Sequence, residues 1–472
     1  MRVQHRVLTG DGVSGDVGAA IVSGLHRIRD EFGVPTEFPA EVLAAAEDAA
    51  KRDPTVTHVD RTDREFRTLD PASSTDLDQA FAIEAGTSGS DVVLHYAIAD
   101  VGFFVSPGDP IDVEAWKRAI TIYLPDERAT LYPTALCERA ASLLPDGPRP
   151  AVVFTVRVDE DGDVRLDGAE RAVILSRAKL SYTDVDPSSI EGFQELSRRI
   201  VAAEERRGAA RVEFPEQELD LTDQGWELRF DPRLESEDQN AGMSLATNLA
   251  VADAMMAART GLFRVMADVP DRSLGRLRHV ARAFHLDWPA EMPLAQFQRA
   301  LPRDDPRSAA FLIAVRRAGG GASYEPYTEG ERPWHAAMAA TYAHATAPLR
   351  RLADRYVVET ALAVANGVDV PEAVQVALTE LPAVMARGDG QANRIDAAVL
   401  DLAEAVLLAD RIGDRFDAVV VDEDDRGPVV QIAEPAVLVR VNAARVTPGD
   451  EITVQLVAAD PAARRVEFRR IA

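Results

Sequence analysis

The sequence predicts a mixed α/β protein with a short helical N-terminal region (residues 1–61), a large α/β domain (62–413) and a small all-β barrel of the OB type (414–472). Three observations predict this fold class. Apolar residues recur at helical spacing near the N-terminus, and from about Thr62 short β-branched runs give way to long helical patterns. After Gly413, short strand patterns follow one another closely.

The N-terminal region is predicted to form two helices. Apolar residues at helical spacing mark the first helix, namely Val17, Ile21, Leu25 and Ile28. Gly33 followed by Pro35 predicts its end, and an alanine-rich stretch predicts the second helix over 39–50. This pair is compatible with a helix-turn-helix type module and equally with a plain helical lead-in.

The large domain begins with strand patterns and continues with helical ones. Alternating or continuous apolar runs rich in β-branched residues predict strands at 66–69, 80–83, 92–98 and 152–158. Helical periodicity then predicts helices at 193–207, 240–260, 341–365 and 393–412. Strands followed by helices in this order indicate one mixed α/β domain.

The C-terminal residues contain five short strand patterns, at 416–421, 429–432, 436–441, 451–457 and 464–468. Clusters of Asp, Gly and Pro separate them. Their number and spacing are typical of a small Greek-key barrel of the OB type.

Composition limits the classes of function. The net charge of −26 argues against a protein that coats nucleic acid with an exposed basic face. An acidic enzyme can still hold RNA in a local channel lined by a few arginines, or through Mg²⁺ held by carboxylates. The single cysteine, Cys137, cannot form an internal disulfide. With no long apolar run and no signal-peptide pattern, we expect a cytoplasmic protein without a membrane partner.

The stretch 70–80 (DPASSTDLDQA) is the most informative acidic motif. Asp76 and Asp78 are two residues apart, so in an extended chain they point the same way. The Pro-Ser-Ser turn after Asp70 can fold that carboxylate back toward them. Three carboxylates brought together repel one another unless they share a hard cation. A solvated acidic loop remains the alternative, because Asp and Ser are common in loops.

Residues 66–80 (FRTLDPASSTDLDQA) resemble the signature of the ribonuclease II / ribonuclease R (RNB) family. Further segments resemble the family in the same order, at 94–101, 123–126, 141–145, 149–151 and 342–355. The resemblance covers 62–412 and implies an RNB-type catalytic domain. It also implies a metal-dependent 3′→5′ exoribonuclease that acts processively as a monomer on the 3′ ends of single-stranded RNA. The products would be nucleoside 5′-monophosphates, and the cofactor Mg²⁺ with Mn²⁺ as an alternative.

The resemblance also assigns roles to single positions. Asp70, Asp76 and Asp78 match the family's metal-binding and catalytic aspartates. Gln79 falls where many members have a fourth aspartate, and its amide can offer Mg²⁺ an oxygen but no charge. Arg350 matches the arginine that contacts phosphate near the cleaved bond, a task that suits the planar guanidinium.

Other positions are expected to contact RNA. Arg351 lies beside Arg350 in the same motif, and Tyr123 matches an aromatic that closes on the 3′-terminal bases. Tyr182 and Phe214 fall where the family places base-contacting aromatics, although packing in the core would explain them as well.

Gln79 and two further departures from the family motivate a second reading, a catalytically weak or inactive RNA-binding protein on the same fold. Ala241 and Gly242 replace paired glutamates, and residues 396–398 (Asp-Ala-Ala) replace Ala-Glu-Arg. His335 and His344 are expected to be structural, because a metal-activated water needs no histidine base. Asp354 is expected to hold Arg350 through a helical ion pair.

Overall fold

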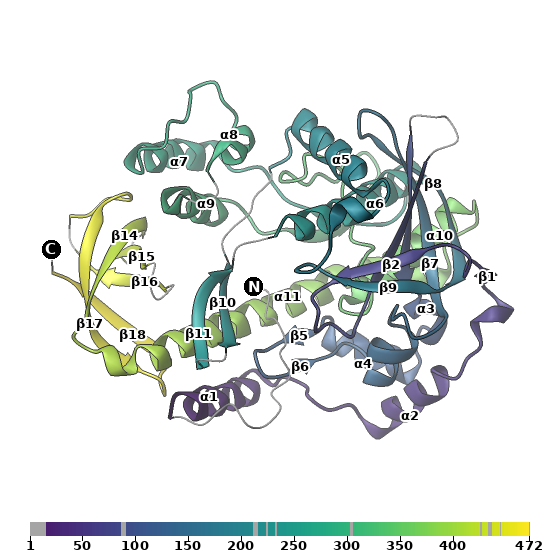
Figure 1. The fold of residues 1–472 in the computed structure, drawn as a ribbon, viewed down its shortest axis with the longest axis horizontal. Helices are drawn as coiled ribbons and strands as arrows, with labels where there is room; N and C mark the ends of the chain where they lie inside the picture. Colours follow the sequence, from purple (N-terminus) through teal and green to yellow (C-terminus); the bar gives the residue numbers. More distant parts are fainter. Residues whose placement is uncertain are drawn as a thin grey trace.

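The computed structural model describes residues 16–85, 91–210, 216–222, 225–231, 234–302, 305–424, 427–432, 437–443 and 445–471. Phe214 lies outside these ranges, so its expected role is not addressed by the structure. The large α/β domain and the closed barrel confirm the predicted fold class, and Figure 1 shows them at opposite ends of the molecule, with the barrel at the left.

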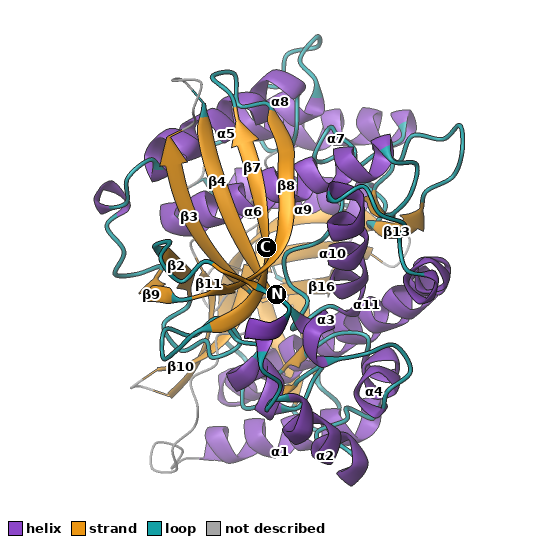
Figure 2. Cartoon of the chain, turned by 90° about the vertical axis from the view of Figure 1, so that its right-hand side faces the viewer, coloured by secondary structure: helices purple, strands orange, loops and turns teal. Residues whose placement is uncertain are grey.

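A seven-stranded sheet in the order β1-β8-β7-β4-β3-β2-β9 forms the centre of the large domain. Its strands are β1 (Val59–Asp60), β2 (Phe66–Asp70), β3 (Gln79–Ala85), β4 (Val92–Ala99), β7 (Arg149–Val158), β8 (Val164–Ile174) and β9 (Ser176–Ser181). Figure 2 shows β3, β4, β7 and β8 side by side as a curved sheet. Every residue of β4 is buried, which explains why its sequence is apolar except for His95.

Helices cover this sheet and carry part of the pocket described below. α6 (Glu235–Ala257) contacts β7 and β8, and α10 (Leu352–Ala365) contacts both β8 and α6. α5 (Phe193–Arg207), which has the predicted bounds, packs on α6. The other short helices of the domain are α3 (Val101–Phe104), α4 (Pro110–Arg118), α7 (Asp271–Ala283), α8 (Leu294–Ala300) and α9 (Pro306–Ala318).

Short strand pairs complete the domain. They are the hairpins β5 (Ile122–Tyr123) with β6 (Arg128–Ala129) and β10 (Glu216–Thr222) with β11 (Gly225–Asp231), and the pair β12 (Leu262–Val265) with β13 (Ser323–Pro326). The β5–β6 hairpin matters most for function, because it places Tyr123 and Arg128 over the β2–β3 loop.

The predicted helix 341–365 is wrong in its first half. The helix α10 begins only at Leu352, and 341–351 form an irregular loop. Pro348 has no N–H to donate, and it disfavours helical geometry at Ala347. Apolar periodicity alone did not reveal this break, which sets the position of Arg350.

The helix predicted at 393–412 starts too late. α11 (Glu372–Leu407) has 36 residues and includes Pro382 in its interior. Buried residues at helical spacing on both sides of the proline hold the helix against the core, among them Leu378, Leu381 and Met385. Figure 1 shows α11 running from the α/β domain to the barrel, where it contacts β17 and β18.

The barrel closes in the order β14-β15-β16-β18-β17. All five predicted strands are confirmed, as β14 (Arg415–Asp424), β15 (Gly427–Ile432), β16 (Val437–Asn442), β17 (Glu451–Asp460) and β18 (Arg465–Arg470). Val421 and Val429 of the barrel share a hydrophobic cluster with residues of α7, α8 and α9, so these three helices pack against the barrel.

The two N-terminal helices are confirmed as α1 (Asp16–Phe32) and α2 (Ala40–Ala49). α1 packs on α11 so closely at Gly24 that an added Cβ would lie 2.4 Å from the Leu402 side chain. α2 packs instead on α4. Within the described part of the chain, none of these helices combines the length and the apolar character that crossing a lipid bilayer requires.

Candidate active site

A pocket of about 670 Å³ lies where the β2–β3 loop, the β5–β6 hairpin, α6 and the 341–351 loop meet. It gathers most of the residues singled out from the sequence. Those that line it are Asp70, Asp76, Asp78, Gln79, Tyr123, Tyr182, Arg350 and Arg351. Residues far apart in the chain therefore share one pocket, as the family resemblance implied.

Asp76 is held by the β5–β6 hairpin. Arg128 Nη1 donates to Asp76 Oδ1 at 2.6 Å, and Nη2 of the same guanidinium donates to Glu138 at 2.7 Å. The Tyr123 hydroxyl donates to Asp76 Oδ2 over a long 3.4 Å. Arg128 thus partly neutralises Asp76, and its position five residues after Tyr123 had offered no local signal of this contact.

Asp78 is a buried carboxylate that faces the loop bearing Arg350. The Leu349 N–H donates to Asp78 Oδ1 at 2.7 Å, and Arg350 Nε lies 3.4 Å from Oδ2. Burial raises the pKa of Asp78 to about 8, against the lowering effects of Arg350 and the Leu349 N–H. The Arg350 side chain remains 45% exposed, so its guanidinium is accessible from the pocket.

The loop that carries Arg350 is held by four side chains from other elements. Three of them accept backbone N–H groups: Asn248 Oδ1 from Ala345 at 2.9 Å, Asp354 Oδ2 from Ala347 at 2.8 Å, and Asp78 from Leu349. The fourth, Gln79, donates its amide Nε2 to the carbonyl of Thr346 at 2.6 Å. These bonds satisfy the backbone of a buried loop that has no helical partners.

Gln79, expected as a metal ligand, has its side-chain amide engaged in hydrogen bonds. Its Oε1 already accepts hydrogen bonds from the Tyr96 hydroxyl at 2.5 Å and from the Ser244 hydroxyl at 3.0 Å. An amide oxygen with two donors has both lone pairs engaged. We therefore omit Gln79 from the set of candidate metal ligands.

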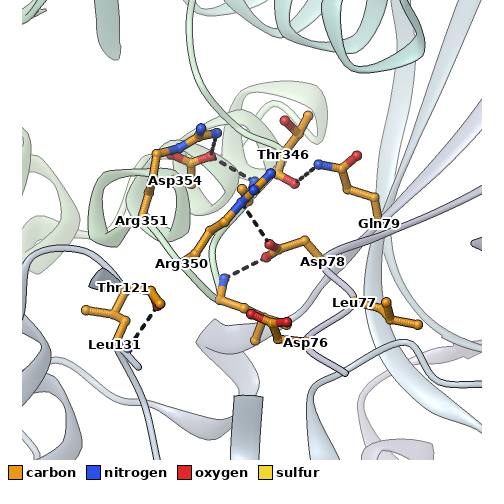
Figure 3. Close-up of polar contacts among 12 residues, drawn as sticks. Asp76, Leu77, Asp78, Gln79, Thr121, Leu131, Thr346, Arg350, Arg351 and Asp354 are labelled. Carbon is orange, nitrogen blue, oxygen red and sulfur yellow. Dashed lines mark hydrogen bonds and ion pairs between the residues drawn. The ribbon is translucent and has the colours of Figure 1, made fainter. Parts of the chain in front are cut away.

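The expected ion pair between Arg350 and Asp354 is wrong. Asp354 pairs with Arg351, with Oδ1 and Oδ2 accepting from Nε at 2.9 Å and from Nη2 at 2.7 Å. The i,i+4 geometry of a helix does not apply, because Arg350 precedes the first residue of α10. Figure 3 shows Arg351 beside Asp354 while Arg350 reaches over Asp78.

A second wall of the pocket contains Tyr182, Asn240 and Ala241. Asn240 Nδ2 donates to the Tyr182 hydroxyl at 2.9 Å, which fixes the phenol at the pocket surface. Of the two positions without the family's glutamates, Ala241 lines the pocket, whereas Gly242 is nearest to Ile200 of α5. Asp396, Ala397 and Ala398 lie on α11 and do not line this pocket.

Asp70, Asp76 and Asp78 supply hard carboxylate oxygens to one pocket, which suits a divalent cation such as Mg²⁺ in donor chemistry. Their arrangement is not that of a formed metal centre. Among the described residues, no three His, Cys, Asp or Glu side chains are grouped so as to hold a metal ion. Arg128 and Arg350 take up the carboxylates of Asp76 and Asp78 instead.

His344 lines the pocket but is poorly suited to take up a proton. Burial and the nearby Arg351 and Arg264 lower its pKa well below the usual value. Its Nδ1 lies 3.0 Å from the hydroxyl of Tyr324. Cys137 is buried as well, and its Sγ donates to the Tyr132 carbonyl at 3.1 Å. Burial raises the pKa of this thiol, so it is not an activated nucleophile.

His335 leads to a prediction about acid stability. Burial and Arg264 lower its pKa to about 4 from 6.5. The unfolded chain binds a proton below about pH 6.5 that the folded chain does not bind until about pH 4, so stability should fall across this window. We expect this histidine to account for about 2 kcal/mol of the loss by pH 4.5. Urea unfolding of the wild type and His335→Gln at pH 7 and 4.5 measures it, and equal losses in both proteins would contradict the assignment.

Comparisons with known proteins show the family to which the chain belongs. The model described as RNB domain matches residues 58–365, and the model described as RNase II-type exonuclease C-terminal S1 domain matches 414–471. Ribonuclease R of Aquifex aeolicus is 25% identical over 492 residues, covering 93% of this chain and 69% of that protein. Ribonuclease R of Thermotoga maritima is 25% identical over 443 residues, covering 87% of this chain and 62% of that protein.

The fold has a counterpart among solved structures. Mycoplasma genitalium RNase R in complex with ribose methylated single-stranded RNA has a TM-score of 0.85 at 19% identity, covering 96% of this chain and 78% of that chain. This likeness shows the shared fold, and the first family model spans well over half of the sequence. The chain therefore belongs to the RNB family and carries an RNase II-type S1 domain behind its RNB domain.

Proposed function

We propose that this protein is a 3′→5′ exoribonuclease that shortens single-stranded RNA processively and releases nucleoside 5′-monophosphates. The observation that carries the proposal is that Asp70, Asp76 and Asp78 converge on one pocket with the accessible Arg350 and with aromatic side chains, among them Tyr123. Relatives named Ribonuclease R, and the solved RNase R with single-stranded RNA, support RNA as the substrate. We also propose that residues 1–61, 62–413 and 414–472 act as lead-in, catalytic domain and RNA-guiding barrel.

The pocket residues have complementary tasks in this proposal. The 3′-terminal bases stack on Tyr123 and Tyr182, which line the pocket from two different elements. The guanidinium of Arg350 binds the non-bridging oxygens of the scissile phosphate and stabilises the charge that builds up during attack by water. The 3′-oxygen of the shortened strand is the leaving group, so the phosphate stays on the 5′ side of the released nucleotide. Arg351, held by Asp354, adds positive charge for the RNA backbone.

Asp70, Asp76 and Asp78 are the residues that would hold a divalent cation, with Mg²⁺ preferred and Mn²⁺ as an alternative. When bound, such an ion would lower the pKa of a water and offset negative charge at the phosphate. Arg128 competes for Asp76 in this arrangement, since the 2.6 Å ion pair occupies one of its oxygens. Arg128 itself is 17% exposed and can turn toward RNA phosphate if it is displaced.

Digestion of end-labelled RNA tests the proposal. A 5′-labelled single strand incubated with protein and Mg²⁺ should yield a ladder of strands shortened from the 3′ end, and EDTA should abolish it. A 3′-labelled strand should release labelled 5′-monophosphate as its first product. A retarded but intact RNA band would favour the RNA-binding protein, and a ladder that persists in EDTA would exclude the proposed metal dependence.

A further inference from the structure

Gln79 joins the sheet to the loop that carries Arg350. Its side chain makes three hydrogen bonds, two through Oε1 to the hydroxyls of Tyr96 and Ser244 and one through Nε2 to the Thr346 carbonyl. Tyr96 and Ser244 also contact each other at 2.8 Å, so they form a closed triangle with Gln79 Oε1. The three partners come from β4, α6 and the 341–351 loop.

The partners of this side chain call for a donor on one side and an acceptor on the other. Thr346 presents a carbonyl, which can only accept, so the group facing it has to donate. The two hydroxyls on the other side can both donate to an oxygen. An ionised carboxylate has no hydrogen to donate, so its oxygen would face the Thr346 carbonyl oxygen as a second acceptor. An amide flipped by 180° would place its own oxygen there and create the same repulsion. A neutral amide satisfies both sides, whereas a glutamate could do so only in its protonated form.

Asp78, just before β3, and Gln79, its first residue, bind the two ends of the segment 346–349. Gln79 binds the carbonyl of Thr346, and Asp78 binds the N–H of Leu349. Arg350 follows directly, with its Nε 3.4 Å from Asp78. Figure 3 shows Gln79 and Asp78 on one side of this segment with Arg350 between them and Arg351. A shift of the Thr346 carbonyl would therefore be transmitted to Arg350 within four residues.

We infer that Gln79 is a positioning residue for Arg350: its amide tethers residues 346–349 to β3 and so sets where the guanidinium meets the scissile phosphate. This inference rests on the proposed function for the part that concerns phosphate. Many family members have an aspartate at this position. With Gln79 the pocket has one negative charge fewer, and the loop gains a hydrogen bond from the side-chain amide.

The test compares Gln79→Glu with Gln391→Glu in the full chain. Gln391 is a matched control, because its Nε2 also donates to a backbone carbonyl, that of Phe32 at 2.9 Å, and it does not line the pocket. Hydrogen exchange is measured without RNA on peptides covering 345–351. Losing the donor leaves a buried carbonyl without its partner and weakens the hold on the loop, so exchange there should be about fivefold or more faster in Gln79→Glu and unchanged in Gln391→Glu.

Single-turnover cleavage adds a readout that a general structural role would not produce. Gln79→Glu should slow cleavage about tenfold or more while RNA affinity changes less than about threefold. Combined with Arg350→Ala, it should cause no further loss, because both changes act through one group. Multiplicative losses in the double variant would overturn the inference, as would wild-type exchange in residues 345–351 of Gln79→Glu.

A neutral variant separates the tether from the added charge. Gln79→Met has a similar length but no donor, so it should also speed exchange in 345–351. It is the deciding variant if Gln79→Glu does not fold, and wild-type exchange in Gln79→Met would refute the tether. A wild-type protein that does not cleave RNA would remove the proposed function, whereas the exchange comparison would still decide whether Gln79 holds the loop.

Discussion

Replacement of Asp78 by Asn should reduce nucleotide release by roughly 10³-fold while RNA still binds. The reason is that the lost carboxylate charge acts on phosphodiester cleavage and not on RNA binding. Asp78 is one of the three carboxylates of the pocket and the one nearest to Arg350. Asn can still accept the Leu349 N–H through its oxygen, so the loop should keep its position. Single-turnover cleavage and fluorescence anisotropy with the same labelled RNA measure the two quantities separately.

The stability of this variant provides an internal check. The raised pKa of Asp78, about 8, shows that burial makes its charged form costly, so a neutral amide should not lower the midpoint of thermal unfolding. Asp112→Asn is a suitable control, because Asp112 is also buried and pairs with an arginine, Arg355 at 2.6 Å, outside the pocket. The control should lose stability but keep its cleavage rate per folded molecule. Parental cleavage by Asp78→Asn would show that the active site has been misassigned.

Arg350→Ala should lower turnover by about 10²–10³-fold, with a much smaller effect on affinity, because the guanidinium acts mainly on charge that develops during the reaction. Arg350→Lys should recover only part of the rate, since an ammonium cannot bind phosphate oxygens bidentately. Rates at saturating enzyme, set against binding titrations at fixed salt, distinguish the two effects.

A surface arginine controls for the loss of positive charge as such. Arg387 on α11 is exposed, donates to the Trp116 carbonyl at 3.1 Å and does not line the pocket. Arg387→Ala should leave both cleavage and binding near the wild-type values. If Arg350→Ala instead lost affinity and kept its single-turnover rate, Arg350 would serve to grip RNA and not to stabilise the reacting phosphate.

Much of the fold was predictable because it is encoded locally. The five barrel strands follow from alternating apolar residues between turn residues, and all five are present. The bounds of α5 agree with its periodicity and with Gly208 at its C-terminus. The motif around Asp70, Asp76 and Asp78 led directly to the pocket that these residues share.

The errors in the predicted helix bounds arose where contacts with residues distant in the sequence outweigh the local pattern of apolar residues. Residues 341–351 have helix-like spacing of apolar residues, but Asp78, Gln79, Asn248 and Asp354 bind the backbone of this segment and hold it as a loop. Pro382 suggests a helix boundary, yet packing of α11 on the core carries the helix through it. The pairing of Arg128 with Asp76 joins residues 52 apart and leaves no trace in either local sequence.

The sequence by itself determined the fold class and the aspartate motif, because periodicity and turn residues are properties of short segments, and the resemblance to the RNB family added Arg350. Only the tertiary structure decided that Arg351 and not Arg350 pairs with Asp354, and that the Gln79 side chain bonds to Tyr96, Ser244 and Thr346. The physical reason is that a hydrogen bond such as that from Gln79 to Thr346 joins residues 267 positions apart, and its formation depends on how β3, α6 and the Arg350 loop pack together.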